Sequence, residues 1–76
     1  MTTLSELQTQ VRSFYMTLLR EVQGGKTEAK EAGSQLKGMS ASLYRTAEMA
    51  DREGCRVRRE LAAETLRASK LLLASG

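Results

Sequence analysis

The stretch TLSELQTQVRSFYMTLLREVQGG, residues 3–25, decides the fold class because it carries the local signals of a complete helix. Thr3 and Glu6 have the spacing of a capping box, in which each side chain accepts a hydrogen bond from the other residue's backbone. Apolar residues then recur at coiled-coil spacing, at Leu4, Leu7, Val11, Phe14 and Leu18. Gly24-Gly25 follows, as glycine commonly does after a helix. We predict a helix over about 3–23 and a turn at 24–26.

The rest of the chain is also predicted to be helical, over about 27–74. It has no proline, few β-branched residues and many good helix formers, and Thr27 is a candidate N-cap. Gly33 and Gly38 each cost about 1 kcal/mol of helix stability relative to alanine. Two explanations for glycine at these positions are the close approach of a second helix and a second turn over 33–38. We favour continuity through 33–38, although a break there or near 54 remains open.

The length of this second region bears on assembly. An unbroken helix over 27–74 would measure about 70 Å, and only a second chain could cover its apolar stripe. A break near 54 would instead permit a compact three-helix bundle within one chain.

The composition favours a small core that needs support. Of the 76 residues, 31 are hydrophobic, but nine of these are alanine. Cys55 is the single cysteine and histidine is absent, which excludes an intramolecular disulfide and disfavours structural zinc. We therefore predict an all-α protein, a helical hairpin or three-helix bundle with coiled-coil-like seams, completed by homo-oligomerisation.

Apolar residues at helical spacing identify the predicted interface. The C-terminal Leu71-Leu72-Leu73 covers about 300° of a helix, so one neighbouring helix cannot bury all three side chains. This predicts an enclosing oligomer or a docking site at that end. The predicted oligomer and partner interface consists of Leu7, Val11, Phe14, Leu18, Leu36, Leu43, Leu61 and Leu72.

Lys26 is the first candidate for anion binding. It lies in Gly24-Gly25-Lys26-Thr27, which matches only the end of the phosphate-binding loop pattern GxxxxGK[ST]. Arg20 stands where that pattern requires glycine, and the segment follows a helix rather than a strand. A helix end followed by an N-cap at Thr27 is the better interpretation.

Arg52, Arg56 and Arg59 are the other candidates for anion binding. Their spacing places them on one helix face, and arginine clusters commonly bind phosphate. Pairs such as Arg56–Glu60, four residues apart, would however neutralise part of that charge.

The chain lacks the residues on which most enzyme sites depend. Glu60 and Glu64 have a spacing that could support acid–base chemistry or a metal ion, but no histidine or second cysteine accompanies them. We predict a protein that is not an enzyme and holds no cofactor or metal ion. No apolar run approaches the roughly 20 residues of a membrane span, and the N-terminus does not resemble a signal peptide. With a lone thiol, these features predict a cytoplasmic protein without membrane contact.

The predicted function is therefore binding. We expect a small non-enzymatic regulator, inhibitor or chaperone that self-associates and binds another protein through apolar helix faces. One alternative is a nucleic-acid or nucleotide binder that uses the arginine face, which a net charge of +3 permits without requiring. A second alternative is a filament subunit built from the unbroken helix over 27–74.

Overall fold

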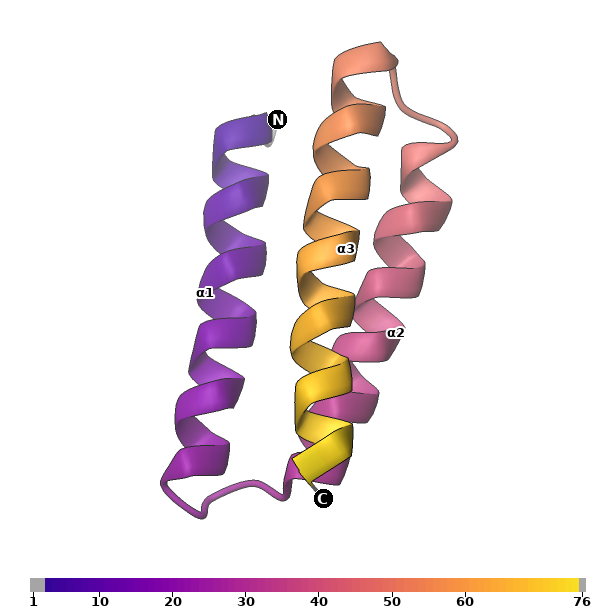
Figure 1. Ribbon diagram of the computed structural model, residues 1–76. Helices are drawn as coiled ribbons and strands as arrows, with labels where there is room; N and C mark the ends of the chain where they lie inside the picture. The colour runs from indigo at the N-terminus through magenta and orange to yellow at the C-terminus, as the bar shows by residue number, and fades with distance from the viewer. Residues whose placement is uncertain (1–2, 76) are drawn as a thin grey trace.

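The computed structural model describes residues 3–75 as three helices packed in a compact bundle (Figure 1). Helix α1 is Leu4–Gln23, α2 is Ala29–Ala47 and α3 is Arg52–Ser75. α1 and α3 run in the same direction and α2 runs against both, so the α1–α2 turn and the α2–α3 turn lie at opposite ends (Figure 1). The all-α prediction is confirmed, in its three-helix form.

The capping box at the start of α1 is present. The backbone N–H of Glu6 donates to Thr3 Oγ1 at 3.1 Å, and the backbone N–H of Thr3 donates to Glu6 Oε2 at 3.4 Å. At the start of α2 the prediction was wrong, because Glu28 rather than Thr27 is the N-cap. The Thr27 hydroxyl donates instead to Glu21 Oε2 at 3.1 Å, which ties the turn to α1.

The end of α1 is a Schellman motif. The N–H of Gly25 donates to Val22 O at 3.1 Å, and the N–H of Lys26 donates to Glu21 O at 2.9 Å. Gly25 has a φ of 74°, a left-handed conformation that favours glycine. The two glycines thus terminate a helix and do not form a phosphate-binding loop.

The second helical region breaks at residues 48–51, a few residues before the predicted break near 54, while the predicted continuity through 33–38 is confirmed. The segment over 33–38 stays helical, and Gly54 lies in the first turn of α3. Asp51 caps α3, since its Oδ1 accepts from the N–H of Gly54 at 2.7 Å. A capping aspartate three residues before Gly54 therefore marks the break more accurately than the glycine itself.

α2 and α3 approach closely because small residues line their contact. A Cβ atom on Gly33 would lie 2.8 Å from Leu73 Cγ and 3.3 Å from the Ser69 carbonyl oxygen. Two buried hydrogen bonds join these helices, from Ser69 Oγ to Gly33 O at 2.6 Å and from Ser40 Oγ to Ala62 O at 2.8 Å. The predicted close approach of a second helix is thus confirmed at Gly33.

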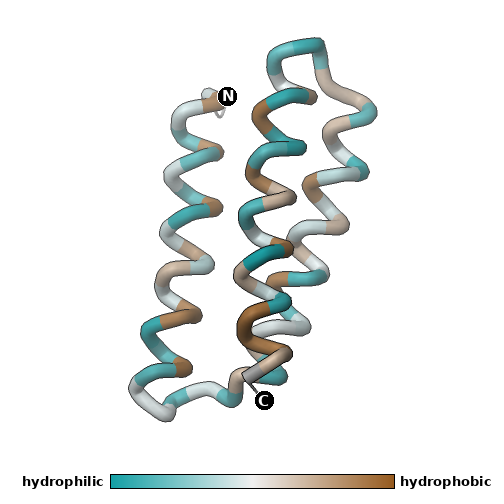
Figure 2. The backbone as a smooth tube through the Cα atoms, in the orientation of Figure 1, coloured by the Kyte–Doolittle hydropathy of each residue, from teal (hydrophilic) through white to brown (hydrophobic). Residues whose placement is uncertain are grey.

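The core is filled where α1 lies against the α2–α3 hairpin. Figure 2 shows most apolar segments of α1 on the side turned toward the other two helices. Tyr15 packs against two clusters, one at each end of the bundle. The first cluster is Val11, Leu43, Val57, Leu61 and Ala62, and the second is Leu18, Ala32, Leu36, Ala68 and Leu72.

Candidate functional site

Most of the predicted interface residues pack inside the single chain. Leu7 is half-buried, whereas Val11, Leu18, Leu36, Leu43, Leu61 and Leu72 are buried. Phe14, which also belongs to the predicted interface, is 40% exposed. The buried face of α1 is centred on Val11, Tyr15 and Leu18, and at about 100° per residue Phe14 lies at its edge.

Six large apolar side chains remain at the surface instead. Their exposed fractions are Met49 89%, Leu71 69%, Met16 46%, Tyr44 41%, Phe14 40% and Leu73 38%. Leu72, between Leu71 and Leu73, is buried. The three consecutive leucines are therefore divided between the core and two different sides of α3, as their angular spread requires.

An ion pair marks the side of the bundle where α1 meets α3. Arg12 Nε and Nη2 donate to the two carboxylate oxygens of Glu64, each at 3.3 Å. This hydrogen bond, and then the attraction of the carboxylate, raise the pKa of the exposed Arg12 guanidinium. Arg12 therefore stays charged throughout the physiological range. The Glu64 carboxylate is paired with Arg12, so Glu60 and Glu64 do not form a free pair of carboxylates.

Two leucines continue this line toward the C-terminal ends of α1 and α3. Leu19 follows Arg12 by seven residues, and Leu71 follows Glu64 by seven residues. Because α1 and α3 run in the same direction, equal offsets place Leu19 and Leu71 at the same level, about two turns beyond the ion pair (Figure 1). Met16, one turn after Arg12, lies on the same side. We call Met16, Leu19 and Leu71 the Met16–Leu71 patch.

Two exposed arginines lie one helical turn along the chain from Met16 and Leu71, and Arg20 also lines a hollow with Thr17 and Glu21. Arg20 lies one turn after Met16, and Arg67 lies one turn before Leu71. Both are exposed, and within residues 3–75 neither forms an ion pair. Sequence reasoning missed this arrangement because it depends on the alignment of α1 with α3. An exposed apolar residue and an arginine at i, i+4 on both helices would have been the signal.

The four candidate anion-binding residues do not form one site. Arg52, Arg56 and Arg59 are all exposed on the first two turns of α3. Arg56 Nη1 donates to Glu60 Oε1 at 3.2 Å, so the predicted pair is confirmed. Lys26 lies in the α1–α2 turn, at the opposite end of the bundle (Figure 1). The structure therefore separates Lys26 from the arginine face by the length of α3.

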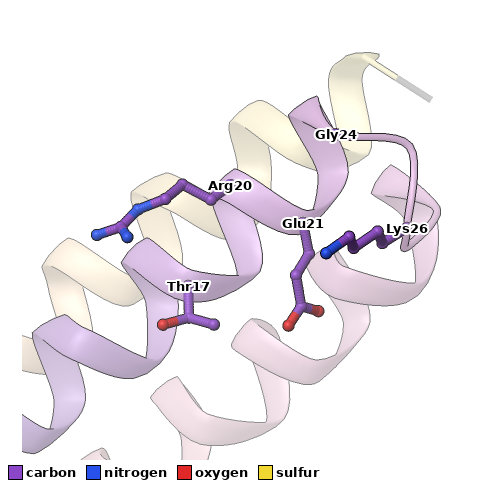
Figure 3. A pocket seen from close by; sticks show the side chains of 5 residues that line it. All are labelled: Thr17, Arg20, Glu21, Gly24 and Lys26. Atoms are coloured by element: carbon purple, nitrogen blue, oxygen red, sulfur yellow. The ribbon is translucent and has the colours of Figure 1, made fainter.

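A shallow hollow of about 390 Å³ lies beside the α1–α2 turn. Figure 3 shows its lining, which is Thr17, Arg20, Glu21, Gly24 and Lys26. The Glu21 side chain lies close to Lys26, the Arg20 side chain extends away from both, and the Glu21 carboxylate already accepts the Thr27 hydroxyl bond. Mixed charge and wide exposure to solvent give this hollow little capacity to hold an anion.

In residues 3–75 no group of three or more acidic or cysteine side chains is placed to hold a metal ion. Glu60 and Glu64 pair separately with Arg56 and Arg12. Cys55 is a half-buried free thiol. None of the helices in this range is long and apolar enough to cross a membrane.

Comparison with protein-family models, with curated proteins and with solved structures finds no match for this chain.

Proposed function

We propose that this chain is a small non-enzymatic helical protein that self-associates and binds a protein partner, and so acts as a regulator, inhibitor or chaperone. The exposed large apolar side chains carry the proposal, because exposed apolar side chains that gather on one face mark interaction surfaces. Met49, Leu71, Met16, Tyr44, Phe14 and Leu73 are each 38–89% exposed in the single chain.

The exposed apolar residues offer two separate surfaces for these two roles. Phe14 and Met16 are two residues apart on α1, so their side chains lie on nearly opposite sides of the helix. Phe14 and the half-buried Leu7 lie one heptad apart on the same face of α1. Of the predicted interface residues, these two remain accessible in a single chain. We therefore assign self-association to the Leu7–Phe14 face and partner binding to the side of Met16.

Light scattering on a sizing column tests self-association. We expect a mass that rises with concentration toward about 17 kDa, twice the 8.4 kDa of the chain, and that changes little with salt. Phe14→Ala should return the mass to that of a monomer. Met49→Ala, which removes a more exposed apolar side chain elsewhere, should not. A wild-type protein that stays at 8.4 kDa at millimolar concentration would refute self-association.

Nucleic-acid binding is the second candidate function, because Arg52 and Arg59 are exposed on one face and form no ion pair within residues 3–75. Absorbance at 260 nm recorded on the same column discriminates the two functions. Excess absorbance that disappears at high salt would favour nucleic acid, since phosphate contacts weaken steeply with ionic strength. The filament alternative relied on an unbroken helix over 27–74, and the break at 48–51 removes that support.

A further inference from the structure

We propose that α1 is an exchangeable helix, which leaves its groove on the α2–α3 hairpin as a unit and is replaced there by the α1 of a second copy. Each copy then contributes one helix to the bundle of the other, which gives a closed dimer with two-fold symmetry. This inference goes beyond the proposed function, because self-association through the Leu7–Phe14 face leaves both bundles closed.

α1 is held in the bundle less firmly than α2 and α3 hold each other. The buried residues of α1 are Val11 and Leu18, whereas α2, of nearly equal length, buries six residues. Two hydrogen bonds from buried serine hydroxyls, at 2.6 and 2.8 Å, join α2 to α3. α1 is joined to α3 by the Arg12–Glu64 pair at the surface, where solvent screens the attraction. Elements with few buried contacts open at the lowest free energy, so α1 is the helix that opens first.

The groove on the hairpin fits one occupant, because the structure shows α1 seated in it. Val11 and Leu18 are buried there, and Leu7, Tyr15 and Val22 are half-buried against the two core clusters. Figure 2 shows most apolar segments of α1 turned toward the hairpin. The α1 of a second copy makes the same contacts, so exchange needs no surface that the closed bundle lacks. An empty groove would leave its apolar side chains in water, which favours refilling it.

The hinge for the exchange is the α1–α2 turn. It consists of residues 24–28, and five extended residues can span at most about 17 Å. The closed turn needs the left-handed φ of 74° at Gly25, together with the hydrogen bond from Lys26 N–H to Glu21 O. An extended hinge needs neither. A Cβ atom on Gly25 would meet nothing within 4 Å, so a substitution there shifts the balance between the two forms without disturbing the core.

The test divides the Arg12–Glu64 pair between two chains. These side chains lie 3.3 Å apart within one closed chain. Thiols placed at positions 12 and 64 of different chains are therefore held together only after α1 has changed hairpins. The Arg12→Cys and Glu64→Cys variants, both in a Cys55→Ser background, are mixed at millimolar concentration, kept overnight in mild urea, returned to native buffer and diluted. A short bismaleimide should then give a cross-linked species of about 17 kDa, twice the 8.4 kDa of the chain.

Two controls limit the cross-link to exchange. Arg45→Cys replaces Glu64→Cys in a parallel mixture and should give little product. Arg45 is exposed and lies two residues after the buried Leu43, so it is on nearly the opposite side of α2. Protein mixed in native buffer and treated at once should also give little product, because α1 must leave its own hairpin before it meets another one.

Variants of the two hinge glycines test the role of the turn. Gly25→Ala places alanine at a left-handed φ, which weakens the closed turn, and should raise the cross-linked fraction at least about fivefold. The matched control is Gly24→Ala, because Gly24 has a φ of −81° that alanine adopts readily. Its cross-linked fraction should stay near that of the parent mixture.

Amide hydrogen exchange tests the release of α1 in the wild-type chain. The amides of α1 should exchange at least about tenfold faster than those in the middle of α2 and α3, because α1 opens while the hairpin stays folded. Equal protection of the three helices would overturn α1 as a separately opening unit.

The remaining outcomes separate this inference from the proposed function. No cross-link in the parent and Gly25→Ala mixtures would overturn the exchange, even if light scattering shows a dimer, and would leave self-association through the Leu7–Phe14 face intact. An equal rise with Gly24→Ala and Gly25→Ala would overturn the turn as the hinge. Cross-linking that persists in Phe14→Ala chains would support the exchange, including the case in which freshly prepared protein is a monomer and the proposed self-association fails.

Discussion

Replacing Gly33 or Gly38 by alanine should have opposite effects on stability, although both glycines lie inside α2. In a helix, alanine is favoured over glycine by about 0.5–1 kcal/mol. A Cβ on Gly38 would meet nothing within 4 Å, so Gly38→Ala should gain this amount. It would also raise Tm by several degrees, since 1 kcal/mol corresponds to about 4–8 °C in a domain of this size.

Gly33→Ala carries a packing cost that exceeds this gain. Its new methyl group would lie 2.8 and 2.9 Å from Leu73 Cγ and Cδ2, and 3.3 Å from Ser69 O. The same stretch of α3 is held to Gly33 by the 2.6 Å bond from the Ser69 hydroxyl, so the backbones cannot separate freely. Overpacking of this kind costs about 1–3 kcal/mol, which leaves Gly33→Ala about 1 kcal/mol less stable than wild type.

Urea unfolding followed by circular dichroism at 222 nm measures both variants, and each midpoint is compared at an unchanged slope. A double-mutant cycle then tests the cause. In a Leu73→Ala background the two shortest contacts are absent, so Gly33→Ala should lose most of its penalty. The reasoning is refuted if Gly33→Ala is as stable as Gly38→Ala in the wild-type background, because the helices would then not be in close contact at that point.

Two further contrasts test the distribution of core and surface residues. Leu72→Asp should unfold the chain, because it places a carboxylate at a site that is only 6% exposed. Leu71→Asp should keep the helical circular dichroism and an unfolding midpoint near that of wild type. An unfolded Leu71→Asp protein would contradict this arrangement of α3. Leu36→Ala should lower the free energy of unfolding by about 2–5 kcal/mol, because Leu36 is fully buried. Phe14→Ala should lower it by less than about 2 kcal/mol, because Phe14 is 40% exposed. Equal losses of stability in thermal unfolding would show that Phe14 is a core residue.

The candidate site could be anticipated only in part. The three leucines at the C-terminus indicated an unburied apolar surface, and Leu71 and Leu73 are exposed. Their angular spread around α3 was enough to show that some of them must face away from any single neighbour. Leu19 could not be linked to Leu71 in this way, because 52 positions of sequence separate them and no local pattern joins α1 to α3. The Arg12–Glu64 pair joins these two helices two turns earlier.

The sequence by itself determined where α1 begins and ends and that the chain is helical. The capping box at Thr3 and Glu6, and the glycine at the left-handed position 25, act within one helical turn and need no tertiary partner. Such signals lie close together in the chain and reinforce one another. They can therefore be interpreted correctly before any packing is known.

Tertiary packing decided what the other glycines and the apolar stripes do. A glycine costs only about 1 kcal/mol relative to alanine in a helix. Tertiary packing therefore decides whether the helix continues through a glycine or ends there. Gly33 stays helical at the point where Ser69 and Leu73 pack against it, whereas the chain turns at 48–51, where Asp51 caps α3. Likewise, the stripe on α1 is wider than the face that two neighbouring helices cover. Only the position of the α2–α3 hairpin made Tyr15 a core contact and left Phe14 at the surface.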